Sequence, residues 1–240
     1  MKEILDQSEL NWITDRLLPE PQDKNWRDRK WKFGHVIPQG FGSYCKILHS
    51  IYEDLDIGDE TRTWNDVKID INNSEYRSLT ARDVVYKLNF NGRRIRLAQL
   101  AAQNNIPFTH QVLDSLYRGQ WPVRLVGATE GEMDFETAHH LARVFYQFTN
   151  DNKYYFGYYD WEKGLQILEG NLADGLVTID AKKYVPGTSL YWWATDRSWC
   201  VAVYGDSEFS LCGASLDLIN ALLADPNLEG FKIDVNEKFT

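Results

Sequence analysis

Apolar residues between positions 41 and 55 recur at steps of three, four and seven residues. This spacing places them on one face of an α-helix, because a helix completes a turn in about 3.6 residues. The residues that form the apolar stripe are Phe41, Tyr44, Leu48, Ile51, Tyr52 and Leu55. We therefore predict a helix that opens just after Pro38 and packs this stripe against a core.

Two later segments have the same period, and each has its own end signals. Asp134 is a candidate N-cap, and Glu136 in the first turn meets the positive end of the helix dipole. A further helix runs from about Ser215 to Ala224 and stops because Pro226 disfavours helical geometry at the residue before it. The inward residues are predicted to be Ala138, Leu141, Ala142, Phe145 and Phe148 in the first of these helices, and Leu216, Ile219, Leu222 and Leu223 in the second. Shorter helices are predicted near residues 5–18, 93–104 and 111–117.

Other segments have the pattern of strands. Residues 30–33 alternate lysine with an aromatic residue, which predicts a strand with one wet face. Residues 199–204 are apolar at every position, which predicts a central strand covered on both faces. Residues 154–161 and 165–168 flank Glu162-Lys163-Gly164 and predict a hairpin, since glycine supplies the positive φ that a tight turn needs.

The order of these elements predicts the fold class. Helices and strands are interspersed without a regular βαβ alternation, which favours an α+β fold with a largely antiparallel sheet flanked by helices. We expect residues 1–240 to form a single domain. The polar stretch at 150–153 coincides with a change in charge along the chain, so it is the candidate seam between two subdomains.

The charge is negative and unevenly distributed. Thirty-five acidic and 26 basic residues give a formal net charge of -9. Residues 151–240 carry 14 acids and 7 bases, a net charge of -7, whereas residues 1–150 carry a net charge of -2. Such a protein repels phosphate, so we expect neither nucleic-acid nor membrane binding. A basic protein partner would meet the C-terminal third first, although a solvated acidic surface explains the same residues.

Cysteine content and the chain ends predict a cytoplasmic protein. Acids lie within the first six residues, where a signal peptide needs positive charge, and no apolar run approaches the roughly 20 residues that cross a bilayer. Three scattered cysteines are too few for a disulfide framework and fit a reducing compartment. If residues 205–207 form a three-residue hairpin loop, Cys200 lies opposite Cys212. The two are then either a redox-sensitive pair or small buried hydrophobic residues, and we favour the second interpretation.

The densest group of functional side chains lies at residues 191–200. It contains three tryptophans and an Asp-Arg pair, and an arginine can stack on tryptophan faces. One interpretation is a binding floor in which the rings take an apolar or sugar-like surface, Arg197 takes an anion and Asp196 orients the guanidinium. The other interpretation is a structural corner in which Asp196 caps a turn and the tryptophans fill core. The candidate ligand- or partner-binding residues here are Trp192, Trp193, Asp196, Arg197 and Trp199.

Other candidate motifs are weaker. Residues 127–131 resemble a phosphate loop only in their two glycines, and we expect a turn in which Glu130, the sixth candidate binding residue, bonds local amides. His139 and His140 are adjacent, so they cannot chelate one metal as an i, i+4 pair does. The basic and aromatic residues at 24–32 suit stacked bases, but an edge strand guarded by lysines explains them as well. We expect no catalytic residue, metal or cofactor.

Four motifs resemble those of a family of uncharacterised bacterial proteins that is widespread in actinobacteria. They are V-P-x-G-F-x-x-Y-x-x-x-L-H at 36–49, with one extra residue after Val36; G-P-x-E-G at 127–131; W-W-P-x-D-R-x-W-C-V-A at 192–202; and L-I-x-A-L-L-x-D-P-x-L-E at 218–229. Two departures are Ala194, where the family has proline, and Leu211-Cys212-Gly213, where it has Y-V-G-G. The resemblance implies no activity. It implies that the segment with Asp196, Arg197 and Trp199 belongs to a shared fold.

Two classes of function remain. The first is a non-enzymatic binding protein of the cytoplasm, for instance an immunity or antitoxin-like inhibitor that covers a basic toxin surface, because acidic charge and aromatic anchors suit an interface. The second is a small-ligand binder or hydrolase-type enzyme with a cleft floored by Trp192, Trp193, Arg197 and Trp199. Its acid-base group would be Asp196 or Glu130. We favour the first class.

Overall fold

The computed structural model describes residues 2–4, 7–21, 31–57, 63, 91–118, 121–122, 124–127, 131, 133–160, 164–174, 190–205 and 207–238. The chain forms two compact units. The first unit consists of Met1–Leu48, Glu130–Met133 and Thr137–Thr240, and the second consists of His49–Thr129 and Asp134–Glu136. The candidate seam at 150–153 lies within the first unit.

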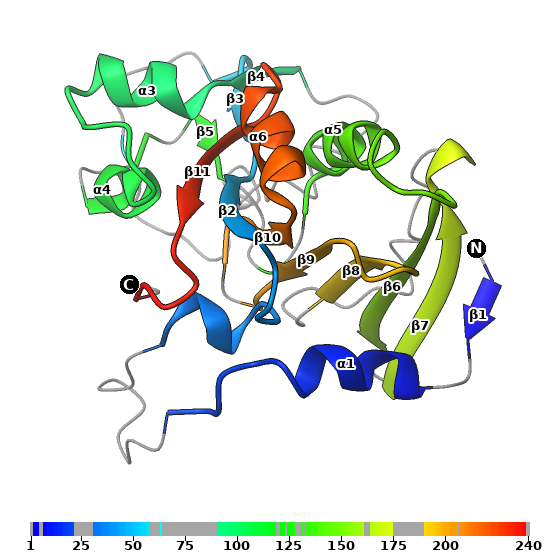
Figure 1. The fold of residues 1–240 in the computed structure, drawn as a ribbon. Coiled ribbons are helices and arrows are strands. Elements are labelled where there is room, and N and C mark those ends of the chain that lie inside the picture. The colour runs from blue at the N-terminus through cyan, green and yellow to red at the C-terminus, as the bar shows by residue number, and fades with distance from the viewer. Residues whose placement is uncertain are drawn as a thin grey trace. The chain divides into compact units, whose positions relative to one another are not determined.

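The first unit is built on an antiparallel sheet of eight strands, and the predicted α+β fold is confirmed. Along the sheet the strands follow the order β1-β7-β6-β8-β9-β10-β2-β11 (Figure 1). Their bounds are β1 (Lys2–Ile4), β2 (Ser43–Leu48), β6 (Lys153–Asp160), β7 (Gly164–Asn171), β8 (Leu190–Ala194), β9 (Cys200–Val203), β10 (Phe209–Ala214) and β11 (Glu229–Ile233). Every neighbouring pair for which a register is defined runs antiparallel.

Both faces of this sheet are covered. Helices α5 (Phe135–Phe145) and α6 (Leu216–Ala224) pack on one face, and the N-terminal segment with α1 (Asn11–Thr14) packs on the other (Figure 1). The described residues of this unit also include the short 3-10 helices η1 (Gln7–Leu10), η3 (Phe33–His35) and η5 (Leu172–Asp174). We refer to the two sides as the helix face and the N-terminal face.

The two long helices begin and end near the predicted residues. In α6, Ser215 is the N-cap, and its hydroxyl accepts a hydrogen bond from the backbone N–H of Leu218. The helix ends before Pro226, as predicted. Leu216 was expected to point inward but is 47% exposed. At about 100° per residue it lies well away from the arc centred on the buried Leu218 and Leu222.

The helix predicted over residues 41–55 is wrong. Its residues form β2 of the first unit and β3 (Ile51–Asp54) of the second. All six residues of β2 are buried, because β10 and β11 flank the strand and both of its faces are covered. A strand buried on both sides shows no alternation of apolar and polar residues, so the apolar spacing there does not report a helix.

Two other predictions near the N-terminus change in the structure. Residues 33–35 form a 3-10 turn, and Lys32 makes a single bridge to Lys238, so the strand predicted at 30–33 is wrong where it is described. Residues 22–30 lie outside the described residues. The helix predicted at 5–18 is confirmed in shorter form as η1 and α1.

The predicted hairpin and the predicted central strand are both confirmed. Strands β6 and β7 pair over their full length, and Gly164 has a φ of +77° at the start of β7. Strand β9 is fully buried between β8 and β10.

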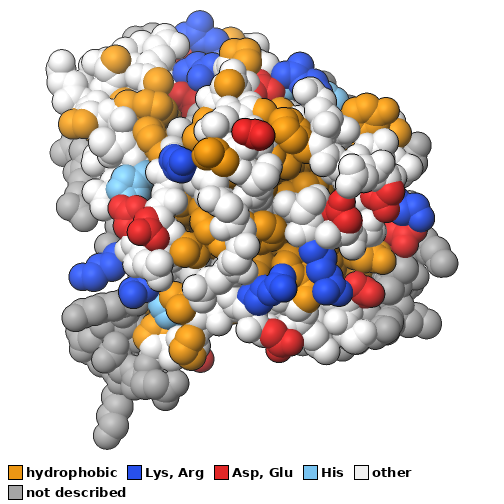
Figure 2. Space-filling model, in the orientation of Figure 1, with side chains coloured by type: hydrophobic (Ala, Val, Ile, Leu, Met, Phe, Trp, Pro, Cys, Tyr) orange, Lys and Arg blue, Asp and Glu red, His pale blue; other side chains and the backbone are white. Residues whose placement is uncertain are grey.

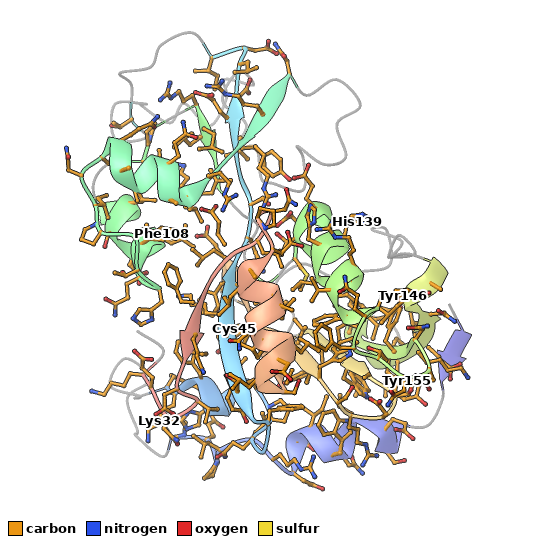
Figure 3. The ribbon with its side chains drawn as sticks, turned by 45° about the horizontal axis from the view of Figure 1, so that its top comes forward. Lys32, Cys45, Phe108, His139, Tyr146 and Tyr155 are labelled. Carbon is orange, nitrogen blue, oxygen red and sulfur yellow. The ribbon has the colours of Figure 1, made fainter. Side chains whose placement is uncertain are left out.

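The predicted cysteine register is wrong by one residue. Ser210 lies opposite Val203, and five residues (204–208) rather than three separate β9 from β10. Cys212 therefore faces Val201 on one side and Cys45 on the other. A one-residue shift moves a side chain to the opposite face of a sheet, which is why Cys200 and Cys212 belong to different core clusters. All three cysteines are free and buried; Cys45 lies on β2 where α6 packs (Figure 3).

The second unit is a small α+β structure. Its sheet has the order β4 (Gly92–Ile95), β3, β5 (Leu125–Val126), and its described residues include the helices α3 (Leu97–Gln103) and α4 (Val112–Arg118). The helix predicted at 111–117 is confirmed, whereas the one predicted at 93–104 begins only at Leu97 because the preceding residues pair with β3. Glu53 is buried between Arg93 and Arg124, whose guanidinium nitrogens lie 2.6 and 3.1 Å from its carboxylate.

Candidate functional site

The tryptophan-rich segment forms the hairpin β8–β9 of the first unit. Successive residues of a strand point to opposite faces, so Trp192 lies on the helix face and Trp193 on the N-terminal face. Trp199, just before β9, lies on the helix face with Trp192. All three indoles are 2% exposed or less. The predicted residues are therefore divided between two cores and do not form an open floor.

On the helix face these rings are part of a close aromatic core. Trp199 stacks on Phe145 of α5 with ring centroids 4.0 Å apart and an angle of 10° between the planes. Trp192 meets Trp199 edge to face at 5.3 Å. The Trp199 indole N–H donates to Thr149 Oγ1 at 2.8 Å, so its polar atom is satisfied inside the core. This half of the segment has a structural role.

The turn between the two strands carries Asp196 and Arg197 to the surface. The Arg197 N–H donates to the carbonyl of Ala194 at 2.9 Å and closes the turn. Asp196 Oδ1 accepts the backbone N–H of Ser198 at 3.0 Å, so this carboxylate braces the turn, which was the structural interpretation of Asp196. Arg197 has a φ of +61°, a left-handed conformation that is uncommon for residues other than glycine, asparagine and aspartate.

Arg197 is placed against a tryptophan that the sequence did not single out. Its Cζ lies 5.6 Å from the centre of the Trp12 ring, and Arg16 Cζ lies 5.7 Å from the same ring. Both distances are in the range of cation–π attraction. The Glu9 carboxylate lies 3.9 Å from Arg197 Nη2. The i, i+4 spacing of Trp12 and Arg16 was a usable signal for part of this contact, whereas Glu9 and Arg197 are far apart in the chain.

Tyr155 on β6 is the central aromatic residue of this surface. It lies opposite Trp193 in the β6–β8 pair, with ring centroids 5.6 Å apart, and its side chain is half-buried (Figure 3). Burial raises the pKa of its hydroxyl, and the negative charges of Glu9, Glu169 and Asp151 raise it further against the opposing effect of Arg197. Three carboxylates and one arginine therefore act on the same hydroxyl, in opposite directions.

We call this surface of the first unit the Tyr155 face. It consists of Tyr155, Trp12, Arg197, Glu9, Asp151 and Glu169. Three of its members come from β6, β7 and the β8–β9 turn, which lie side by side because the sheet has the order β7-β6-β8. The N-terminal segment brings the other aromatic ring and a carboxylate. Of the predicted site residues only Arg197 belongs to this face, and Trp193 lies beneath it.

Two of the three carboxylates of the Tyr155 face, those of Glu9 and Glu169, are loosely paired, whereas Asp151 accepts hydrogen bonds from the Lys153 N–H and the Thr195 hydroxyl at 3.0 and 2.9 Å. Glu169 lies 3.9 Å from Lys153 Nζ, the same distance that separates Glu9 from Arg197. A charge-assisted hydrogen bond between such groups measures about 2.7–2.9 Å. Glu9 and Glu169 are 33% and 29% exposed, so both retain accessible oxygen atoms. A second cation can therefore approach either carboxylate. On the side of the molecule drawn in Figure 2, acidic and basic side chains are interspersed and do not form one field of a single sign.

Two buried indole donors beneath this surface are unsatisfied within the described part of the chain. The Nε1 atoms of Trp12 and Trp193 have no hydrogen-bond acceptor there, and the same is true of Trp192 on the helix face. A buried donor without a partner costs about 1–3 kcal/mol. Unsatisfied indole donors therefore occur on both faces of the sheet.

The second unit contains a buried polar cluster of a different kind. The Ser50 N–H donates to Asp134 Oδ2 at 2.9 Å, and the Ser50 and Tyr52 side chains are hydrogen-bonded. Burial lowers the pKa of His49 to about 4, against the attraction of Asp134, so this imidazole is neutral at pH 7. Burial, with Asp134 and Glu136 adding to it, raises the pKa of Tyr52. All four side chains are 8% exposed or less, which suits a structural cluster.

Several predicted features carry no site in the described residues. Glu130, with residues 128–130, lies outside them. Within the described residues no group of three or more His, Cys, Asp or Glu side chains is arranged to hold a metal ion. A search of the same residues finds no helix with the length and apolar character needed to span a membrane.

Comparisons with protein-family models, with curated protein sequences and with solved structures find no match to this chain.

Proposed function

We propose that this chain is a non-enzymatic, cytoplasmic protein-binding module that holds a basic protein partner on the Tyr155 face, in the manner of an immunity or antitoxin-like inhibitor. The observation that carries the proposal is the arrangement of three carboxylates around one half-exposed aromatic ring. An aromatic anchor with charged groups at its rim is the arrangement in which binding energy concentrates at protein interfaces.

The anchor is held in place before a partner arrives. Tyr155 lies on a strand with neighbours on both sides, and its ring packs on Trp193, which is fully buried. The Tyr155 side chain therefore loses little conformational freedom when a partner binds. A rigid anchor raises affinity because the entropic cost of ordering it is small. This supports the choice of the sheet surface over the termini as the binding face.

The charge around the anchor selects the sign of the partner. Glu9, Asp151 and Glu169 raise the pKa of the Tyr155 hydroxyl and Arg197 opposes them, while Arg16 and Lys153 are further cations of this surface. The wider charge is negative, because residues 151–240 carry a net charge of -7. Complementary charge increases the association rate and disfavours acidic partners. The three free, buried cysteines suit a reducing compartment, which supports a cytoplasmic location.

Site-specific photo-crosslinking tests this proposal. p-Benzoylphenylalanine replaces Tyr155 in one variant and Leu216 in a control, because Leu216 is 47% exposed on α6 of the helix face. After irradiation in the organism from which the sequence comes, we expect the Tyr155 variant to form an adduct with one basic protein. The adduct should weaken when Glu9→Gln and Glu169→Gln are added, since these changes remove the carboxylates without altering shape.

Two results would contradict the proposal. One is an adduct that forms equally from position 216, which would make the capture independent of the face. The other is a specific adduct at 155 with an acidic protein, or one that persists when both carboxylates are neutral. An adduct supports the proposal only if excess wild-type chain, which carries no photo-crosslinker, suppresses its formation.

A further inference from the structure

The Trp12 ring holds two guanidinium groups of the chain itself. Arg16 and Arg197 place their Cζ atoms 5.7 and 5.6 Å from its centre. Trp12 is only 7% exposed, and both distances are within the range of cation–π attraction. A planar guanidinium stacks on an indole better than a compact ammonium does. This ring is therefore already a surface on which arginine binds.

A carboxylate completes the chemistry of arginine recognition at the same place. Glu9 Oε2 lies 3.9 Å from Arg197 Nη2, which is too long for a charge-assisted hydrogen bond. The Arg197 side chain is 48% exposed, so water screens the pair and its contribution is small. Arg197 can therefore leave this position at low cost, and an arginine with better geometry can take its place.

The backbone of Arg197 also favours a role for its side chain. Its φ of +61° is a conformation that glycine or asparagine adopts more readily. The turn itself is closed by the backbone N–H of Arg197, a bond that glycine would make as well. A strained residue kept where its side chain reaches Trp12 and Glu9 indicates that the guanidinium is used there.

We propose that the Trp12 ring and the Glu9 carboxylate form an arginine-binding subsite, occupied in the free chain by Arg197 and taken over in the complex by an arginine of the basic partner. This inference rests on the proposed function for the existence of that partner. It adds the identity of the recognised side chain and the way in which the free chain protects its own subsite. Arg197 is a competitor in this scheme and makes no contact that the complex needs.

The scheme predicts that removal of Arg197 tightens binding. The probe is a capped tri-arginine peptide, titrated into ¹⁵N-labelled protein while the Trp12 indole N–H resonance is followed. A Trp12→Phe variant assigns that resonance. We expect the peptide to shift it, capped tri-lysine to shift it much less, and Arg197→Ala to bind tri-arginine about fivefold more tightly than wild type.

A matched control separates displacement from a simple change in charge. Lys232→Ala removes one positive charge from an exposed position of β11, and three strands separate β11 from β8. It should leave the affinity for tri-arginine at the wild-type value, whereas Glu9→Gln should weaken it. If Arg197→Ala fails to fold, Arg197→Gly gives the same test, because glycine accepts the backbone conformation of the turn.

The inference is overturned if Arg197→Ala binds tri-arginine no more tightly than wild type, if Lys232→Ala shows the same gain, or if tri-lysine binds equally well. These outcomes leave the crosslinking result at Tyr155 untouched, so the face can bind a basic partner without this subsite. Conversely, an arginine-selective shift at Trp12 without any position-specific crosslink at 155 would support the subsite and count against the proposed function.

Discussion

Each face of the eight-stranded sheet carries an arginine–carboxylate pair, and the two pairs differ in their distance and in the burial of the carboxylate. On the helix face, Arg143 Nη2 lies 2.7 Å from Asp225 Oδ2; the Asp225 side chain is 3% exposed and that of Arg143 is 54% exposed. On the N-terminal face, Arg197 Nη2 lies 3.9 Å from Glu9 Oε2, with the two side chains 48% and 33% exposed. The two arginines are similarly exposed, so the short distance and the buried carboxylate are what make the first pair the stronger one, whereas the second can exchange its partner.

A tryptophan on each face shows a similar difference in burial and hydrogen bonding. Trp199 on the helix face is fully buried, stacked on Phe145 and hydrogen-bonded to Thr149. Trp12 on the N-terminal face lies under two arginines, and its indole N–H has no acceptor among the described residues. We therefore propose that the helix face contributes most of the stability and that the N-terminal face is the one that binds a partner. The predictions below test this division, starting with the largest effect.

Trp199→Ala should lower the free energy of unfolding by about 3–5 kcal/mol, since it removes a large, fully buried ring from the core. Urea denaturation followed by circular dichroism measures the change. Trp199→Phe, which keeps a ring against Phe145 but loses the bond to Thr149, should cost less, about 1–3 kcal/mol. If the alanine variant lowers the free energy of unfolding by less than about 1 kcal/mol, the structural role assigned to the helix face is contradicted.

Asp225→Ala should cost about 1–3 kcal/mol, because the carboxylate accepts bonds from Arg143 and from the backbone and side chain of Asn227. Glu9→Ala should cost less than about 1 kcal/mol, since its pair with Arg197 is long and screened. The same denaturation experiment compares the two variants. Equal losses would show that the pairs do not differ and would contradict the comparison.

The dependence of stability on pH should distinguish the pairs as well. Burial alone would raise the pKa of Asp225, but hydrogen bonds from Asn227 and Arg143 outweigh it and hold this pKa below 3.8. The carboxylate therefore stabilises the fold above pH 3.8, and this contribution is lost as the pH falls through the lowered pKa. The stability difference between wild type and Asp225→Asn should thus shrink below about pH 4. A difference that stays constant down to pH 3 would contradict this assignment.

Substitutions at Arg197 test the contribution of the backbone to stability. Arg197→Gly should be more stable than Arg197→Ala by about 1 kcal/mol, because only glycine adopts a φ of +61° without a steric cost. Thermal melts of the two variants, which lack the same guanidinium, isolate the backbone contribution. If alanine proves equal to glycine, the position is not strained, and the argument that the side chain is kept for use loses one of its supports.

The sequence predicted the elements that have strong end signals. Ser215 and Pro226 bound α6, and Gly164 follows the tight turn of the β6–β7 hairpin. The fold class followed from these elements and their order. The sequence did not predict β2, because a strand covered by β10 and β11 and by layers on both faces carries no alternation to detect. The cysteine register depended on an assumed loop length that the structure replaces with a longer one.

The candidate site was only partly predictable for a related reason. Arg197 stood out beside its tryptophans, but those three rings are core residues. The ring that Arg197 reaches is Trp12, and the carboxylates near it come from Glu9 and Glu169. These residues meet only because β6 lies between β7 and β8 and because the N-terminal segment crosses that face. The spacing of residues along the sequence cannot predict that these residues lie together.

The mobility of the arginine side chains tests the central claim most directly. Arginine-selective NMR measures rotation about the Nε–Cζ bond and the ring-current shift of each guanidinium, before and after capped tri-arginine is added. Arg143 should rotate slowly in both samples. Arg197 should rotate fast, and the peptide should abolish the shift that the Trp12 ring imposes on it. Rotation of Arg197 as slow as that of Arg143, or a ring-current shift that saturating peptide leaves unchanged, would contradict the account.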